Sequence, residues 1–223
     1  MIDSTAVLAD VCFLRGLDEP TLASFAALGH ARTYPRGNVI YHYGDPCHTL
    51  YVVLTGRVKL SIIGEDGREV SLDVQNPGDV CGLVASVDDG PHVGTTITMA
   101  RSRLLAIPTP RFRAWLVEHP PAQQALMLEL ARRLRRTYAR IGSHVLLPVK
   151  ERLRSLLYEM ARDEGVANGA QEMVLARPTH QDLAERVGST RVVVTRALKS
   201  LLEDQDFEVD GRVLRVRITA AEE

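Results

Sequence analysis

The sequence predicts an α+β fold built from three consecutive parts: an antiparallel β domain, one long helix, and a C-terminal helical pair that ends in a hairpin. Residues 33–108 hold short runs of Val, Ile, Leu, Tyr and Thr separated by glycine-containing turn pairs. From Pro121 to about Val145 there is no further proline, and the first glycine is Gly142, as a long helix requires. The last 75 or so residues alternate helical patterns with a glycine turn and paired strands.

The composition is that of a soluble globular chain. With 223 residues, 45% of them hydrophobic and 25% charged, the chain can bury one ordinary core and has room for a second. No stretch approaches the roughly 20 uncharged apolar residues of a membrane helix, and no basic segment precedes an apolar signal run. We therefore expect a cytoplasmic location and no membrane partner.

The cysteines indicate neither disulfides nor a metal site. Cys12, Cys47 and Cys81 are odd in number and widely spaced, so we expect buried thiols. The sequence indicates no cofactor and no metal. The net charge of -1 is uninformative about nucleic acid, because partners respond to the local distribution of charge.

The first part, residues 1–118, is predicted to be the β domain. The runs "TLYVVLTGRVKLSII" and "REVSLDV" flank Glu65-Asp66-Gly67, where Gly67 supplies the positive φ of a tight hairpin. A short amphipathic helix is expected from Glu19 to Leu28.

The second part, residues 119–147, is predicted to be a dimerisation helix and hinge. The helix runs from Pro120 or Pro121 to about Val145, and Pro148 breaks it. Met127, Leu134 and Ile141 recur every seven residues, which favours pairing in a homodimer through residues 121–145. Packing of this stripe on the β domain is the alternative. The same stripe includes Leu130, Ala131, Tyr138 and Val145, and the opposite face holds Arg132, Arg135, Arg136 and Arg140.

The third part, residues 148–223, has the pattern of a winged helix-turn-helix. Thr179 and Asp182 match a capping box, small Ala184 permits close helix approach, and Gly188 supplies the turn. A second helix follows, and "FEVDGRVLRVR" places Asp210-Gly211 between alternating strands, which predicts the hairpin.

The stretch "GSTRVVVTRAL" divides the second helix into two faces. A helical wheel places Val193, Val194, Ala197, Leu198 and Leu201 on one apolar arc toward the core. It places Arg191, Val192, Thr195, Arg196 and Lys199 on the opposite, outer arc. Residues 148–223 hold 12 Lys plus Arg against 14 Asp plus Glu, yet residues 186–202 hold four cations and no acid. This local concentration favours DNA over the alternative of an ordinary solvated face.

Over almost its whole length the chain resembles the CRP/FNR family of bacterial transcription regulators. The segments that carry the resemblance are "GDPCHTLYVVLTGRVKL", "PGDVCG", "LARRLRRTY" and "THQDLAERVGSTRVVVTRALKSL". It implies an N-terminal double-stranded β-roll, of the cyclic-nucleotide-binding kind, that senses an effector. It further implies a long dimerisation helix and a winged helix that reads a two-fold symmetric double-stranded DNA operator, with RNA polymerase as a partner.

The recognition helix of this family commonly reads Arg-Glu-x-x-x-Arg, and the matching positions here are Arg191, Val192 and Arg196. Each arginine can form a bidentate pair with guanine, whereas valine offers only apolar contact, best met by a thymine methyl. "GSTRVVVTR" is similar to the nitrogen-control regulator NtcA, which reads GTA. We therefore expect GTA- or GTG-like half-sites that prefer A·T at the central step. Ser189, Thr190 and Thr195 are expected to bind phosphates or cap the helix, and Lys199 to join the basic face.

The resemblance also locates the sensor, where two polar anchors are missing. Relatives that bind cyclic nucleotides carry Gly-Glu-Leu and a later Arg-Ser or Arg-Thr, aligned here with Gly82-Leu83-Val84 and His92-Val93. Losing the ribose acceptor and the phosphate partner predicts weak cyclic AMP binding. Thr137 matches the family's base-contacting threonine, but Tyr138 replaces the small residue beside it.

Three interpretations of the sensor stay open. The likeness to NtcA implies 2-oxoglutarate, held by backbone amides at residues 82–84 and by Arg133. Cys81 could sense oxidants, although a structural thiol is the simpler interpretation. Alternatively there is no effector, and Leu83, Val93 and Tyr138 fill the pocket.

An iron–sulfur cluster needs more N-terminal cysteines than Cys12. Haem binding through His30, His42, His48 or His92 has no support from their spacing.

Two rival function classes are weaker. A cupin-like enzyme needs a His-x-His pair, which is absent, and His42 and His48 are expected in a loop. No nucleophile elbow is visible, so we expect no enzyme activity. A protein-interaction module that binds an acidic partner is the second rival, and salt-dependent binding to a palindromic duplex distinguishes it.

Overall fold

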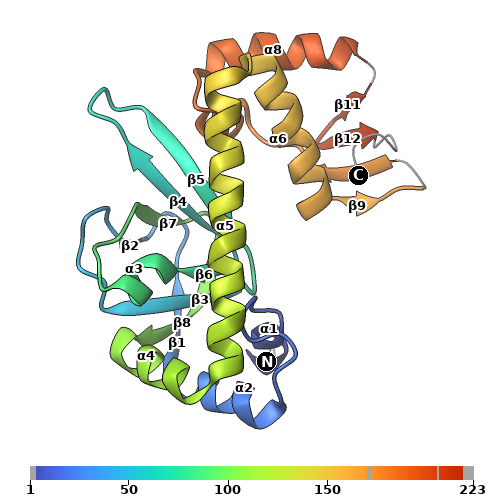
Figure 1. The fold of residues 1–223 in the computed structure, drawn as a ribbon. Coiled ribbons are helices and arrows are strands. Elements are labelled where there is room, and N and C mark those ends of the chain that lie inside the picture. Colours follow the sequence, from blue (N-terminus) through green and yellow to red (C-terminus); the bar gives the residue numbers. More distant parts are fainter. Residues whose placement is uncertain (1–3, 170–171, 205, 218–223) are drawn as a thin grey trace. The chain divides into compact units, whose positions relative to one another are not determined.

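The computed structural model describes residues 4–169, 172–204 and 206–217 (Figure 1). Contacts between residues divide the chain into two compact units, Met1–Arg136 and Thr137–Glu223. The division falls inside the long helix, so the sequence-based boundaries at residues 118 and 147 stay a prediction. Within the described residues, no helix is long and apolar enough to cross a membrane.

The first unit is built around two four-stranded antiparallel sheets. One sheet has the strand order β1-β8-β3-β6 and the other β2-β7-β4-β5, so most neighbours in each sheet are distant in sequence. The strands are β1 His30–Tyr34, β2 Val39–Tyr41, β3 Thr49–Thr55, β4 Val58–Ile63, β5 Glu69–Gln75, β6 Val80–Cys81, β7 Thr95–Thr98 and β8 Ser102–Pro108. The predicted antiparallel β domain is confirmed.

The β4–β5 hairpin forms where the turn sequence predicted it. Ile63 pairs with Glu69, and Gly67 in the loop adopts a φ of +76°. A residue with a side chain would be strained in this conformation, so the glycine fixes the tight return of the chain.

In the part of the first unit that the structure describes, four helices precede the long one: α1 Ser4–Ala9, α2 Glu19–Ala26, α3 Leu83–Asp88 and α4 Thr109–Glu118. The Asp18 side chain caps α2 by accepting a hydrogen bond from the Thr21 backbone N–H at 2.9 Å. The helix expected to reach Leu28 therefore starts where predicted and ends two residues earlier, at Ala26.

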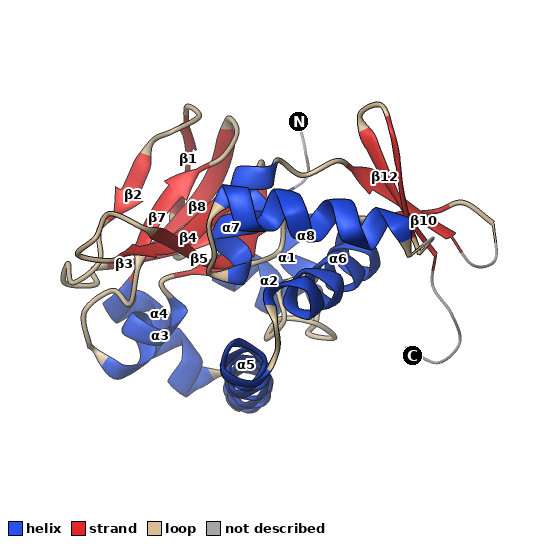
Figure 2. Cartoon of the chain, turned by 90° about the horizontal axis from the view of Figure 1, so that it is seen from above, coloured by secondary structure: helices blue, strands red, loops and turns tan. Residues whose placement is uncertain are grey.

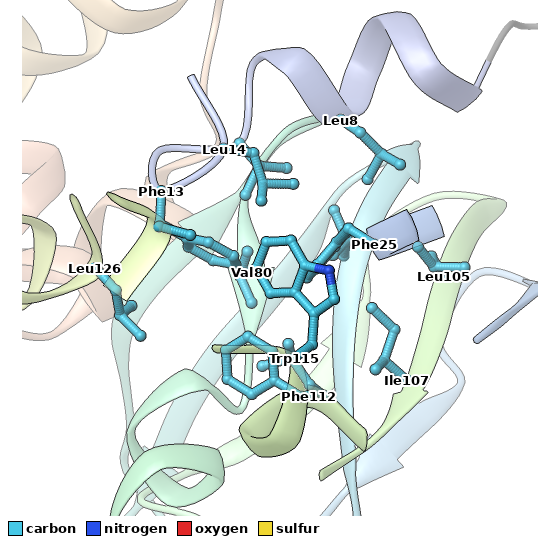
Figure 3. Packing of buried hydrophobic residues seen from close by; sticks show 14 of the residues in the cluster. Leu8, Phe13, Leu14, Phe25, Val80, Leu105, Ile107, Phe112, Trp115 and Leu126 are labelled. Carbon is cyan, nitrogen blue, oxygen red and sulfur yellow. The ribbon is translucent and has the colours of Figure 1, made fainter. Parts of the chain in front are cut away.

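An aromatic cluster packs α2 and α4 against the β1-β8-β3-β6 sheet. Phe13, Phe25 and Phe112 are fully buried, and the Phe25 ring meets Trp115 edge-on with centroids 5.0 Å apart (Figure 3). The Trp115 indole N–H donates to Ser24 Oγ at 2.8 Å, so this large ring is buried without an unpaired donor. Leu126 extends the same core to the beginning of the long helix.

The long helix α5 covers Pro120–Leu146 and confirms the predicted helix. Its first turns are anchored, because Ala122 and Leu126 are buried in the core of the first unit. From Met127 onward it carries an apolar stripe on its surface, composed of Met127, Leu134, Tyr138, Ile141 and Val145, all exposed.

Among its described residues, the second unit contains three further helices, α6, α7 and α8 (Figure 2), and a four-stranded antiparallel sheet of order β11-β12-β10-β9. Their bounds are α6 Val149–Glu164, β9 Val166–Ala167, β10 Glu172–Ala176, α7 His180–Val187, α8 Arg191–Glu203, β11 Phe207–Asp210 and β12 Val213–Arg217. Leu153 and Leu157 of α6, Val194 of α8 and Val216 of β12 are buried in one shared core.

The terminal hairpin has a slightly different turn from the one predicted. Asp210 pairs with Val213, so Asp210 is the last residue of its strand and the two loop residues are Gly211 and Arg212. Gly211 has a φ of +58°, the left-handed conformation that a two-residue hairpin turn demands.

Candidate nucleic-acid interface and sensor segment

Helix α7 begins at the predicted cap and ends at the predicted glycine. The Thr179 hydroxyl accepts a hydrogen bond from the Asp182 backbone N–H at 3.1 Å. At the other end Gly188 has a φ of +62°, and the Ser189 N–H returns to the Ala184 carbonyl oxygen at 2.9 Å. This left-handed termination reverses the chain within two residues and starts α8 across α7 (Figure 2).

Helix α8 is held by one buried side. Val194, Leu198 and Leu201 lie in the core, with Ala197 half-buried beside them. The prediction that Val193 also faces the core is wrong, since 41% of it is exposed. The helical wheel places Val193 at one edge of the apolar arc. The buried face of α8 is narrower than that arc and leaves this edge in solvent.

The opposite side, here called the reading face, consists of Arg191, Val192, Thr195, Arg196 and Lys199. All five are exposed, as predicted. Neither arginine nor Lys199 makes an ion pair with any residue that the structure describes. The face therefore presents unneutralised cations around an exposed valine. Guanidinium groups in this state can donate two parallel hydrogen bonds to an acceptor pair.

The three hydroxyl residues expected to bind phosphates or cap the helix are placed differently from one another. Thr190 is the N-cap of α8, and its hydroxyl accepts from the Val193 backbone N–H at 3.4 Å. Ser189 is half-buried in the turn. The Thr195 hydroxyl donates to the Arg191 carbonyl oxygen at 2.8 Å and also contacts His180 Nδ1 at 2.8 Å.

Helix α6 supports the turn through arginines that sequence patterns did not single out. Arg152 Nη1 donates to the Val187 carbonyl oxygen at 2.8 Å, directly before the Gly188 turn. Arg154 reaches Asp204 at 2.7 Å, beyond the end of α8. Basic residues spaced along α6 were visible in the sequence, but nothing in their pattern identified which carbonyl or carboxylate they meet.

The candidate sensor segment, residues 81–84, lies at the start of α3. Cys81 is fully buried, its thiol is 3.5 Å from Gln75 Oε1, and burial raises its pKa. Such a thiol is a poor oxidant sensor, because the thiolate is the reactive form. Leu83, at the position of the family's glutamate, packs into the aromatic core, whereas Val84 is exposed.

His92, at the position of the family's arginine, is buried by the sheet. Its ring stacks on Tyr41 with centroids 3.5 Å apart and an interplanar angle of 7°. Burial lowers the pKa of His92, which favours the uncharged imidazole. A Cβ added at Gly82 would lie 3.2 Å from His92 Cε1, so the His92 ring also lies directly beside the residue that precedes α3.

Two residues expected to fill the sensor in the absence of an effector are exposed in the single chain. Val93 is 47% exposed and Tyr138 is 64% exposed. For Val93 that part of the effector-free interpretation is wrong for one chain, whereas Tyr138 belongs to the other unit and its role stays a prediction. Thr137 is likewise exposed on α5.

Arg133 is held on its own helix. Its Nε donates to Glu129 Oε1 at 2.9 Å, and Glu129 also accepts from Arg136 at 3.2 Å. Burial by itself would lower the pKa of Arg133, but the hydrogen bond to Glu129 together with the nearby charges of Asp73 and Glu129 outweighs it, and the pKa is raised. An incoming carboxylate would compete with Glu129 for this guanidinium.

The loop histidines and Cys47 lie as the sequence predicts, whereas Cys12, predicted to be buried, is only half-buried. His42 and His48 are exposed loop residues, and His30 is exposed on β1. Cys47 is buried and Cys12 half-buried, both as free thiols.

Comparisons with known proteins match both units. The family description "Cyclic nucleotide-binding domain" matches residues 31–119, and "Crp-like helix-turn-helix domain" matches residues 151–222. A CRP-like cAMP-activated global transcriptional regulator of Mycobacterium tuberculosis is 27% identical over 206 residues, covering 92% of each chain. The global nitrogen regulator of a Synechocystis strain is 29% identical over 207 residues, 89% of this chain and 92% of that one.

Among solved structures, the c-di-GMP-responsive global regulator CLP of Xanthomonas campestris is similar to this chain with a TM-score of 0.77. It is 25% identical, and the match covers 91% of this chain and 100% of that one. The similarity to these regulators therefore extends over both the β domain and the helix-turn-helix.

Proposed function

The chain belongs to the CRP/FNR family of DNA-binding transcription regulators, and we propose that it acts as a homodimer that reads a palindromic operator with the reading face of α8. Members of this family are regulators, so the chain is a regulator rather than an enzyme. The remaining components of the proposal are the base preference, the dimer, the effector and the partner.

One observation carries the proposal: α8 buries its aliphatic side and leaves two guanidinium groups unneutralised on the other. Arg191 and Arg196 lie on adjacent turns of one helix face. In the major groove each can pair with O6 and N7 of a guanine, worth about 1–3 kcal/mol of discrimination. A two-fold dimer then places the two half-sites about 34 Å apart.

Val192 between these arginines sets the proposed base preference. It is 61% exposed, so its methyl groups are available to a partner rather than to the core. Valine cannot accept a hydrogen bond from cytosine, and its best contact in the major groove is the thymine methyl. This supports GTA- or GTG-like half-sites with A·T at the central step, and the similarity to a nitrogen regulator is in keeping with it.

The apolar stripe of α5 supports the homodimer. Its five side chains recur at heptad spacing on a helix whose first turns are already anchored in the core. Aliphatic surface left in water is unfavourable by about 25 cal/mol per Å², and pairing with the same stripe of a second chain removes it.

We further propose that activity does not depend on cyclic AMP. A cyclic phosphate needs a cationic partner, and the uncharged, stacked His92 does not supply one. The ribose hydroxyl needs an acceptor, and Leu83 is buried apolar surface. The regulator then either acts without an effector, its abundance controlling activity, or senses another small molecule such as 2-oxoglutarate, whose carboxylates would compete with Glu129 for Arg133.

RNA polymerase is the proposed protein partner, and the cytoplasm, where operator DNA and polymerase occur in bacteria, is the proposed location. Both follow from the family rather than from a surface of this chain.

The test is a fluorescence anisotropy titration of a symmetric duplex with GTA half-sites and of a scrambled duplex. Without ligand we expect selective, salt-dependent binding that cyclic AMP leaves unchanged. The same titration is repeated with 2-oxoglutarate as the second candidate ligand. Arg191→Ala with Arg196→Ala should abolish selectivity, whereas Arg162→Ala, an exposed arginine of α6, should not. Selectivity that survives the double substitution would contradict the reading face, and strict dependence on cyclic AMP would contradict the sensor.

A further inference from the structure

A three-residue hydrogen-bond chain links the two helices of the helix-turn-helix. His180 Nδ1, in the first turn of α7, lies 2.8 Å from Thr195 Oγ, and that hydroxyl lies 2.8 Å from the Arg191 carbonyl oxygen. Thr195 belongs to the reading face, so the imidazole of α7 reaches the surface proposed to meet DNA.

This series of hydrogen bonds determines which imidazole nitrogen of His180 carries the proton. A threonine hydroxyl has one hydrogen, and the Arg191 carbonyl oxygen can only accept, so the hydroxyl hydrogen lies on that bond. Thr195 Oγ must therefore accept at His180, and Nδ1 carries the proton. In the neutral ring Nε2 then carries no hydrogen and can only accept a hydrogen bond. In the imidazolium Nε2 is protonated and becomes a second donor.

Nε2 of His180 is available for a new contact. The ring is half-buried, and Nε2 makes no hydrogen bond with any residue that the structure describes. Arg191 and Arg196, which precede and follow Thr195 on the exposed side of α8, make the local field positive and favour an anion there.

The charged groups around His180 come from three helices. On its own helix, Asp182 accepts from Arg186 and Glu185 accepts from Gln181. On α8 the nearest cations in sequence to Thr195 are Arg191 and Arg196. Helix α6 meets α7 at the opposite end, through Arg152 at Val187 and Glu164 at Arg186. These carboxylates already have partners, so the cations of α8 leave the surface beside His180 able to attract an anion.

We propose that His180 is a proton-linked positioning residue that donates from Nε2 to a phosphate oxygen of the DNA backbone while Nδ1 holds Thr195 and the α8 backbone. The inference rests on the proposed operator binding and adds its pH dependence. The neutral ring would face the phosphate with a lone pair, so binding takes one proton from solvent to form the Nε2–H donor. Operator affinity therefore rises as the pH falls, and no base preference changes, because phosphate contacts position without specifying.

The experiment measures operator Kd by anisotropy at pH 8.0 and pH 6.0, each over a series of salt concentrations. The proteins are wild type, His180→Gln, Thr195→Val and Thr195→Ser, with His42→Gln, an exposed loop histidine of the β domain, as matched control. We expect wild-type affinity to rise by about three- to tenfold more than that of His180→Gln from pH 8.0 to pH 6.0. At pH 6.0 His180→Gln should lower the salt slope by about 0.9, one phosphate contact, with no change at pH 8.0.

The other variants separate positioning from bulk charge. Thr195→Val should lose the additional pH dependence, and Thr195→Ser, which keeps the hydroxyl, should retain it. Equal pH dependence in wild type and His180→Gln, with selective binding intact at pH 8.0, would overturn this inference alone. Absence of selective binding by wild type at both pH values would overturn the proposed function and this inference with it.

Discussion

Arg152 of α6 donates from Nη1 to the backbone carbonyl oxygen of Val187 at 2.8 Å. Val187 is the last residue of α7, and its carbonyl belongs to the group of helix-end acceptors that lack an intrahelical partner. The contact therefore fixes the start of the Gly188 turn to a different helix, and with it the origin of α8.

Removing this donor should loosen the helix-turn-helix. Arg152→Met keeps most of the aliphatic stem and leaves the Val187 carbonyl without its donor, at an expected cost of about 1–3 kcal/mol of unfolding free energy. Urea denaturation measures it. The control is Arg162→Met, an exposed arginine of the same helix. Equal stability of the two variants would contradict a supporting role for Arg152.

Gly188 tolerates a side chain poorly for two reasons. Its φ is +62°, and an added Cβ would lie 3.1 Å from His144 Nε2. Gly188→Ala should therefore cost more than Gly211→Ala, which has a similar φ of +58° but open space around it; the left-handed conformation alone costs about 1–2 kcal/mol. Thermal unfolding compares the two. If the two alanines destabilise equally, the His144 contact contributes nothing.

Val192→Glu should change the base preference of the operator. A glutamate in the major groove accepts from the cytosine amino group, so the central step should move from A·T toward G·C by at least about tenfold in relative affinity. Competition between two labelled duplexes that differ only at this step measures the change. Val193→Glu, one residue further round α8, is the control and should leave the preference at that step as in wild type.

A charge in the apolar stripe should prevent pairing. Leu134→Glu places a carboxylate on the stripe of α5, and its burial against a second chain is unfavourable. We expect monomer in sedimentation velocity at concentrations where wild type is dimeric. Arg135→Glu, which also introduces a carboxylate but lies off the stripe, should remain dimeric. A dimeric Leu134→Glu would mean that another surface carries the pairing.

His92 should make the β domain sensitive to acid. Its pKa is lowered by burial from the ordinary value of 6.5, so its contribution to stability is complete above pH 6.5 and is lost as the pH falls through the lowered value. His92→Phe keeps a ring on Tyr41 and removes the titration. We expect it to lose less stability than wild type between pH 7.5 and pH 5.0 in urea denaturation, and exposed His42→Gln to behave as wild type.

The elements that the sequence predicted well are those set by local chemistry. The absence of glycine and proline defined α5, Thr179 and Gly188 defined both ends of α7, and Gly67 defined a hairpin. Each depends on residues within a few positions of one another, so periodicity and turn preferences suffice.

The features that could not be predicted depend on partners distant in the chain. β1 pairs with β8 across about 70 residues, the Tyr41–His92 stack spans 51 residues, and His180 meets Thr195 across 15. Val193 shows the limit of the helical wheel, because the width of a buried face depends on the core that covers it. Arg133 matched a family position, yet only the structure reveals its bond to Glu129.

The stripe on α5 also makes the amount of regulator a physical variable. A lone chain leaves these aliphatic groups in water, so under the proposed pairing mass action ties folding to self-association, and the melting temperature rises with protein concentration. At low copy number, doubling expression would then raise the concentration of dimers more than twofold. The response to the amount of protein is therefore steep without any ligand.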